Sequence, residues 1–208
     1  AGPLVAAAVL FDYEALSNAD RRALAGLHDS KQVLVERREE LYSAVLRAAA
    51  RACIVVRCVR GIDDRGLHVT NIEALSCALE RLAPSAEATC LVDGFSLREC
   101  AVPHRAVVEG DGTSAAIAAA SVLAKVTRDR YMQGIADRHP GWGFDEHVGY
   151  STPEHRAAIE RIGISPLHRR SPPCYPCCRR CRRFRRGRRR PPRTRQPGRR
   201  ARPDRRWA

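Results

Sequence analysis

The segment from Leu91 to Ala124 constrains the fold most, because it places two aspartates at the ends of apolar, strand-like runs. Asp93 ends the first run, and Asp111 follows the second run and precedes an alanine-rich stretch typical of a long helix. A carboxylate at a strand end is held by rigid backbone and still reaches solvent, which suits a divalent cation. Each aspartate also has a purely structural interpretation, since Asp-Gly is a common turn pair and Asp favours helix N-termini.

Hydrophobic periodicity divides most of the chain into strand-like and helix-like segments. Short apolar runs predict strands at residues 4–11, 53–59, 89–92 and 105–108. Helical spacing predicts a short helix from Ala19 and longer helices at residues 35–50, 71–82, 113–139 and 153–162. Asn71 and Thr152 are the expected N-caps of two of these helices. This order predicts an α/β domain in which a mixed central sheet carries helices on both faces.

The net charge of +14 is concentrated at one end of the chain. Residues 171–208 hold 16 arginines and one acid, whereas the preceding 170 residues hold 21 basic and 22 acidic side chains. The body therefore does not by itself require a polyanionic partner. Nine cysteines without regular spacing fit a reducing compartment better than a disulfide framework. The apolar opening at residues 1–11 is too short to span a bilayer.

The arginine-rich tail at residues 172–208 has almost no aliphatic side chains, so we expect it to be disordered. Two hypotheses account for it. One is a reading-frame shift in a GC-rich gene, because the composition changes abruptly. The other is a nucleic-acid-binding arm, because arginine at this density attracts polyanions.

Several motifs together resemble bacterial ribonuclease HII. They lie in that family's order across residues 1–171, the expected catalytic domain, and include the two aspartate motifs Leu91-Val92-Asp93-Gly94 and Glu109-Gly110-Asp111. Others are Ala1-Gly2-Pro3-Leu4-Val5, Asp29-Ser30-Lys31, Ala118-Ala119-Ala120-Ser121-Val122-Leu123-Ala124-Lys125, His147-Val148-Gly149-Tyr150-Ser151-Thr152 and Ser165-Pro166-Leu167-His168-Arg169. The resemblance implies a ribonuclease H-like fold.

The resemblance also implies a function. Ribonuclease HII is an endoribonuclease that degrades the RNA strand of RNA–DNA hybrids and nicks 5′ of single ribonucleotides embedded in duplex DNA. It uses four carboxylates and two Mg²⁺ or Mn²⁺ ions, and such closely held cations need several negative oxygen ligands. The resemblance further implies a cytoplasmic, monomeric hydrolase that contributes to DNA repair and has no membrane partner.

Two of the four catalytic carboxylates have counterparts here, as the resemblance assigns Asp93 to the third and Asp111 to the fourth. The family's first two belong to an Asp-Glu-x-Gly-Arg-Gly segment upstream of the counterpart of Ala1, and the 208 residues do not contain it. The same segment supplies much of the contact with the ribose 2′-hydroxyl. We therefore expect this chain alone to be weak or inactive. The alternative function is a catalytically inactive fragment that binds nucleic acid non-specifically through its arginine-rich tail.

Three further residues are candidates for substrate binding. The resemblance places Tyr150 beside the sugar at the ribo–deoxyribo junction, where an aromatic ring can test the sugar. The alternative to this binding role is that Tyr150 is an ordinary half-buried tyrosine of a loop. Ser30 and Lys31 match a loop that contacts backbone phosphates, although a lone loop lysine is otherwise an ordinary solvated charge.

Other polar residues have structural interpretations. Asp129 follows Asp111 mostly along one helix, which separates the two by about 24 Å, so we expect Asp129 to pair with neighbours such as Arg128 instead. Three histidines of the C-terminal half lack tight metal-ligand spacing, and we expect hydrogen-bonding roles for them: His147, His155 and His168. One helix face of small side chains is expected to pack closely on the sheet; it holds Ser114, Ala118, Ser121 and Lys125.

Overall fold

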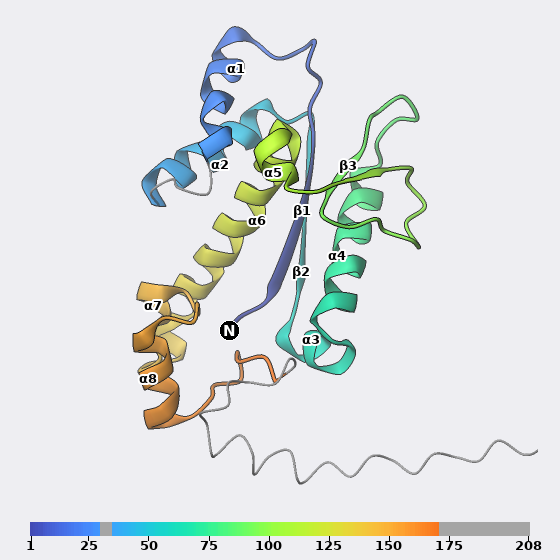
Figure 1. The fold of residues 1–208 in the computed structure, drawn as a ribbon. Helices are drawn as coiled ribbons and strands as arrows, with labels where there is room; N and C mark the ends of the chain where they lie inside the picture. The colour runs from blue at the N-terminus through green and yellow to red at the C-terminus, as the bar shows by residue number, and fades with distance from the viewer. Residues whose placement is uncertain (30–34, 171–208) are drawn as a thin grey trace, which may run out of the picture.

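The computed structural model describes residues 1–29 and 35–170, and shows two pairs of strands flanked by helices (Figure 1). Strands β1 (Leu4–Leu10) and β2 (Arg51–Arg57) pair antiparallel. Strands β3 (Leu91–Asp93) and β4 (Arg105–Val107) pair parallel. Both strand orientations of the expected mixed sheet are therefore present. In the described part of the chain these strands form two two-stranded sheets, β1–β2 and β3–β4.

Strand β1 is covered by helices on both faces, as expected. Its residues alternate between two hydrophobic clusters, because successive side chains of a strand point to opposite faces. Leu4 and Ala6 pack in one cluster with helix α4 (Leu67–Leu82). Ala7 and Val9 pack against the other cluster, which includes side chains of α2 (Val35–Ala48) and α6 (Ala115–Gly134). The hydrophobic core therefore lies on both sides of the β1–β2 pair.

The remaining elements before β3 are short. Helix α1 (Asn18–Leu24) begins at a capping box in which Ser17 and Asp20 bind each other's backbone N–H. A 3₁₀ turn, η1 (Ala25–Asp29), follows it. Helix α3 (Val59–Arg65) was not predicted. Gly66 follows it and is both the C-cap of α3 and the N-cap of α4. The expectation that Asn71 caps α4 was wrong, because the left-handed φ of Gly66 (90°) already breaks the chain one turn earlier.

The segment after β4 contains an additional helical turn. Helix α5 (Gly110–Thr113) precedes α6, so Asp111 lies in a helical turn rather than at a strand end. Helix α6 ends at Gly134 and a 3₁₀ turn, η2 (Ala136–Arg138), follows, so the helix predicted to reach residue 139 is shorter. Helix α7 is Phe144–His147 and α8 is Pro153–Ile162. Thr152 caps α8 by accepting the His155 N–H at 3.2 Å, which confirms the predicted cap.

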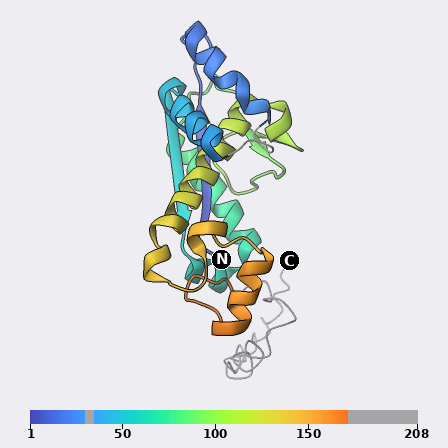
Figure 2. The same cartoon turned by 90° about the vertical axis from the view of Figure 1, so that its left-hand side faces the viewer.

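The two ends of the described chain meet. Figures 1 and 2 place α7 and α8 near the N-terminus, at the opposite end of the molecule from α1 and α5. The Gly2 N–H donates to Leu167 O at 2.8 Å. Arg169 donates to Gly2 O at 2.9 Å and to Pro3 O at 2.7 Å. These bonds fix the start of β1 against the C-terminal segment.

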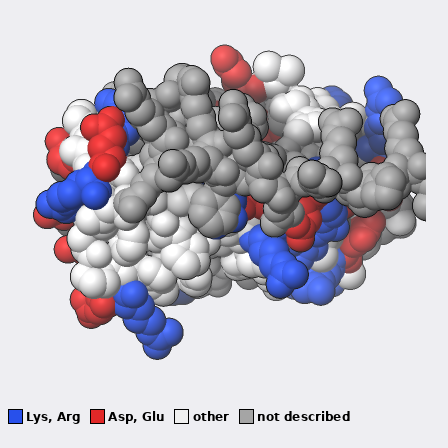
Figure 3. All heavy atoms as spheres, turned by 90° about the horizontal axis from the view of Figure 1, so that it is seen from below, with Lys and Arg blue, Asp and Glu red and all other residues white. Residues whose placement is uncertain are grey.

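The surface of the described residues carries mixed charge. Figure 3 shows acidic and basic side chains interspersed on one face, in keeping with the nearly balanced count of the first 170 residues. The five described cysteines are free thiols. None of the described helices is long and apolar enough to cross a membrane. The predicted tail lies outside the described residues.

Candidate active site

Asp93 and Asp111 are brought to the same edge of the molecule by the β3–β4 pair. Because the two strands are parallel, their carboxyl ends lie together, with Asp93 opposite Val107 in the register. The Gly110 N–H donates to Asp93 Oδ1 at 2.9 Å, and Asp111 follows in the first turn of α5. The Asp93 side chain is exposed and Asp111 is partly buried. The expected proximity of the two sequence motifs is therefore found.

Gly110 is the packing constraint that joins the two motifs. A Cβ built at this buried position would collide with Cδ1 of Ile117 and lie 3.3 Å from Asp93 Oδ1. The preceding residue, Glu109, has a left-handed φ of 52°, which is unfavourable for a residue with a side chain. Such strain is commonly found at functional segments, where the surrounding structure holds it in place.

The described carboxylates do not make a complete two-metal site. Two closely held divalent cations need several anionic oxygens. Asp93 and Asp111 supply two carboxylates, and no group of three or more His, Cys, Asp or Glu side chains among the described residues is arranged to hold a metal ion. The donor type fits Mg²⁺ or Mn²⁺, but the number of donors does not.

Tyr150 lies on a cluster of cationic side chains from α6. Lys125 Nζ donates to Tyr150 Oη at 3.1 Å, and the Arg128 guanidinium lies 4.5 Å from the ring centroid. Tyr150 is 44% exposed, so a ligand can reach part of this side chain. Sequence reasoning missed Lys125 and Arg128 as members of this cluster. Their three-residue spacing places them on one helix face, which was the signal that could have found them.

Asp129 belongs to this basic cluster and not to the aspartate edge. It accepts from Arg128 Nη1 at 3.2 Å, and its carboxylate lies 3.7 Å from Arg38 and 3.9 Å from Lys125. The prediction that Asp129 pairs with neighbouring basic residues is therefore confirmed. It acts as a counter-ion that orients the cations around Tyr150.

The aspartate edge and the tyrosine cluster lie along one stripe of α6. Ile117 contacts the Asp93–Gly110 corner, whereas Lys125 contacts Tyr150. Eight residues of helix separate Ile117 from Lys125, or about 12 Å along the axis, and the net rotation of about 80° keeps both within one broad face of α6. Ser121 lies between them and is exposed, so the expectation that it packs closely on the sheet was wrong. Ser30 and Lys31 lie outside the described residues.

The predicted hydrogen-bonding role of the histidines is confirmed. The Ser165 N–H donates to His168 Nδ1 at 2.9 Å, so His168 carries its proton on Nε2, which lies 3.0 Å from His155 Nε2. His155 Nδ1 in turn donates to Tyr150 O at 2.7 Å. Burial, with a smaller contribution from the neighbouring His155, lowers the pKa of His168 to about 3. His147 accepts the Gly149 N–H at 3.1 Å.

Comparison with known proteins gives a consistent set of relatives. The family model described as Ribonuclease HII matches residues 1–172. Ribonuclease HII of Nocardia farcinica is 48% identical over 171 residues, which are 82% of this chain and 66% of that protein. Ribonuclease HII of Geobacillus kaustophilus is 42% identical over 171 residues, which are 82% of this chain and 62% of that protein. The chain thus spans less than two thirds of the length of these two relatives.

Solved structures agree with the sequence relatives. The crystal structure of ribonuclease H2 from Pyrococcus horikoshii superposes with a TM-score of 0.65 at 25% identity and covers 81% of this chain and 86% of that one. Ribonuclease HII in its complex with PCNA from Archaeoglobus fulgidus gives a TM-score of 0.67 at 23% identity and covers 84% and 89%, a likeness of fold. The predicted ribonuclease H-like fold is confirmed. The chain belongs to the ribonuclease HII family.

Proposed function

We propose that this protein is the greater part of an endoribonuclease that cleaves the RNA strand of RNA–DNA hybrids and nicks duplex DNA on the 5′ side of embedded ribonucleotides. The observation that carries the proposal is the hydrogen bond from the Gly110 N–H to Asp93, which joins the end of β3 to the helical turn that holds Asp111, in a chain of the ribonuclease HII family. The reaction is hydrolysis of a phosphodiester that leaves a 5′-phosphate and a 3′-hydroxyl.

Asp93 and Asp111 are the proposed oxygen ligands for Mg²⁺ or Mn²⁺. When bound, the two cations activate a water molecule and stabilise the leaving 3′-oxygen. Asp93 is exposed, and its bond from the Gly110 N–H fixes one carboxylate oxygen and leaves the other free to bind a cation. The remaining carboxylates are proposed to come from an Asp-Glu-x-Gly-Arg-Gly segment, which is not among the 208 residues.

Tyr150 is the proposed contact with the sugar of the ribonucleotide. Its exposed ring can pack on a ribose, while Lys125 and Arg128 lie close enough to hold the adjacent phosphates. The spacing of about 12 Å along α6 between this cluster and the aspartate edge suits a substrate backbone that runs along the helix. Ser30 and Lys31 are proposed to contact phosphates further along. The proposed enzyme is cytoplasmic and monomeric.

The test compares the 208-residue chain with the same chain preceded by the family's Asp-Glu-x-Gly-Arg-Gly segment. Each is incubated with Mg²⁺ or Mn²⁺ and end-labelled duplex DNA that contains one ribonucleotide. We expect the extended protein to cut on the 5′ side of the ribonucleotide. The 208-residue chain should cut at least about 100-fold more slowly, since loss of even an outer-shell partner of a metal site costs up to that factor.

The control separates the proposed ligands from other carboxylates. In the extended protein, Asp93→Asn or Asp111→Asn should abolish cleavage, whereas Asp137→Asn, an exposed residue of η2, should not. Equal cleavage by the extended protein and its Asp93→Asn variant would overturn the proposal. The alternative function, binding through the arginine-rich tail, has no observation in its favour, because residues 171–208 lie outside the described part of the chain. Salt-sensitive binding without cleavage by the extended protein would support it.

A further inference from the structure

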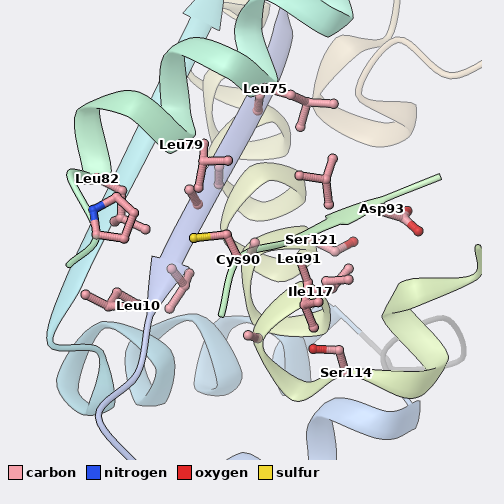
Figure 4. Close-up of a pocket in the computed structure, with 18 of the residues that line it drawn as sticks. Leu10, Leu75, Leu79, Leu82, Cys90, Leu91, Asp93, Ser114, Ile117 and Ser121 are labelled. Atoms are coloured by element: carbon pink, nitrogen blue, oxygen red, sulfur yellow. The ribbon is translucent and has the colours of Figure 1, made fainter. Parts of the chain in front are cut away.

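Tyr150 is carried by the turn between α7 and α8, residues 148–152. Figure 4 shows the aspartate edge, where Asp93 and Ile117 line a cavity. Tyr150 contacts α6 further along the helix, through Lys125 and Arg128. Both of these contacts involve the tyrosine side chain, so the backbone of the α7–α8 turn must be held by other residues.

The α7–α8 turn has a strained backbone. Val148 has a left-handed φ of 45°, and Gly149 has one of 79°. A positive φ is unfavourable for a β-branched residue such as valine, and the strain persists only where surrounding contacts hold it. Within the turn, the Tyr150 N–H donates to His147 O and the Thr152 N–H donates to Tyr150 O, each at 2.9 Å. These local bonds move with the turn, so they do not fix it to the rest of the molecule.

His155 joins the α7–α8 turn to helix α8. Its Nδ1 donates to Tyr150 O at 2.7 Å. The imidazole is buried and stacks on His147 with the ring centroids 4.4 Å apart. It also meets the Phe144 ring in a T-shaped contact at 5.7 Å. Because the ring is packed on two sides, its orientation toward the Tyr150 carbonyl is fixed in advance.

His168 decides which nitrogen of His155 carries the proton. The Ser165 backbone N–H donates to His168 Nδ1 at 2.9 Å. A backbone N–H is always a donor, so His168 Nδ1 is an acceptor and the proton of this ring lies on Nε2. His168 Nε2 donates to His155 Nε2 at 3.0 Å, which leaves the His155 proton on Nδ1, facing Tyr150 O. One backbone amide therefore sets the direction of the whole chain of hydrogen bonds.

We propose that His155 is a positioning residue for Tyr150, the proposed sugar contact, and that His168 holds His155 in the tautomer this role needs. Both histidines are buried and act through the tyrosine. His155 holds the backbone of Tyr150, while Lys125 and Arg128 hold its ring. Misplacing a substrate-contacting group by about 1 Å can cost about 100-fold in rate. The proposal rests on the proposed function of Tyr150.

NMR spectra of the full 208-residue chain test the hydrogen-bond chain without any cleavage assay. Nitrogen–proton correlation spectra of the imidazole rings report which nitrogen carries the proton. We expect protonation on Nδ1 in His155 and on Nε2 in His168. We also expect nuclear Overhauser effects between the ring protons of Tyr150 and the side chain of Arg128, because the two groups are in contact.

A matched pair of substitutions separates positioning from packing. His155→Asn places its amide nitrogen near the position of Nδ1 and can still donate to Tyr150 O, whereas the longer side chain of His155→Gln places it near the position of Nε2. Both variants lose the same imidazole ring, so a role in packing alone predicts similar effects. We expect the Overhauser effects between Tyr150 and Arg128 to persist in His155→Asn and to disappear in His155→Gln.

Cleavage kinetics of the extended protein show whether His155 acts through Tyr150. On duplex DNA with one ribonucleotide, His155→Gln should lower kcat/KM by about 10- to 100-fold, and His155→Asn by less than about threefold. In the Tyr150→Ala background, His155→Gln should have less than about a twofold further effect, because no ring is left to position. A residue that serves stability alone would lower kcat/KM by the same factor in both backgrounds.

His139→Gln is the control within the same group of rings. The His139 ring lies 6.3 Å from the Phe144 ring, between centroids, but is not part of the hydrogen-bond chain that runs from Ser165 to Tyr150. This variant should keep the Overhauser effects of Tyr150, and its kcat/KM should stay within about twofold of the parent value.

Three results would count against the proposal. The first is a proton on Nε2 of His155 in the parent protein. The second is that His155→Gln and His155→Asn affect the Tyr150 signals equally. The third is an equal loss of kcat/KM from His155→Gln with and without the tyrosine ring. If the extended protein does not cleave at all, the proposed function fails, and the NMR results still decide whether His155 positions Tyr150.

Discussion

At the residue scale, the buried pair His155 and His168 makes the fold sensitive to acid. Their hydrogen bonds require both rings to be neutral, and burial lowers the pKa of His168 to about 3. In the unfolded chain the same histidine has a pKa near its ordinary value of 6.5. Between pH 6.5 and pH 3 the unfolded chain therefore binds one proton more than the folded chain. Stability is full above pH 6.5 and falls as the pH is lowered through this window.

We predict that the free energy of unfolding decreases by up to about 1.4 kcal/mol per pH unit between pH 6 and 4 because of this group. Urea unfolding at a series of pH values measures it. His168→Asn should flatten this slope, since an amide does not titrate. His68→Asn, at an exposed histidine, should leave it unchanged. Equal slopes in the parent protein and His168→Asn would contradict the prediction.

Gly110 makes a residue-scale contact that holds the two aspartates together. We predict that Gly110→Ala costs about 1–3 kcal/mol of stability, because its Cβ collides with Ile117 Cδ1 and crowds Asp93 Oδ1. Ile117→Val removes that Cδ1. In the Gly110→Ala background the valine should therefore recover about 1 kcal/mol, whereas alone it should cost about as much. Additive effects of the two substitutions in urea unfolding would show that the contact is not the cause.

At the element scale, Gly66 separates α3 from α4 with a left-handed φ of 90°. No atom lies within 4 Å of a Cβ built there. We predict that Gly66→Ala lowers stability by about 1–2 kcal/mol through backbone strain alone. Gly134→Ala is the matched control, since Gly134 ends α6 with ordinary φ and equal space. It should raise stability by up to about 1 kcal/mol, so thermal unfolding should shift in opposite directions for the two variants.

Element boundaries show where local sequence was sufficient. Thr152 was predicted to cap α8, and it does, because a cap depends on its own side chain and the next three residues. Asn71 is an equally good capping residue by type, yet it lies inside α4. Helix α4 instead begins one turn before Asn71, directly after Gly66, and its packing against β1 stabilises that first turn.

At the scale of the whole molecule, Arg169 joins the C-terminal segment to the start of β1 through two carbonyl groups. Burial lowers the pKa of this guanidinium. We predict that Arg169→Lys lowers the free energy of unfolding by about 1–3 kcal/mol. The single ammonium group of lysine cannot donate to Gly2 O and Pro3 O in the way that the planar guanidinium does. Urea unfolding and faster exchange of the Gly2 amide are the measurements.

Arg161→Lys is the control for this prediction. Arg161 is exposed and donates one hydrogen bond to Gly141 O at 3.1 Å, so its replacement should cost less than about 0.5 kcal/mol. Similar losses for the two variants would mean that Arg169 does not act as a clamp between the chain ends.

The sequence by itself determined the elements and the pairing of two motifs. Apolar runs and helical spacing depend on neighbouring residues, so they identified β1, β2 and α8 and placed Asp93 at the end of β3. Only the tertiary structure decided which residues pack against each face of a helix or strand. It exposed Ser121, placed Lys125 and Arg128 on Tyr150, and divided the strands into the pairs β1–β2 and β3–β4. Such contacts join residues far apart in the chain, and no local pattern encodes which of them will be neighbours.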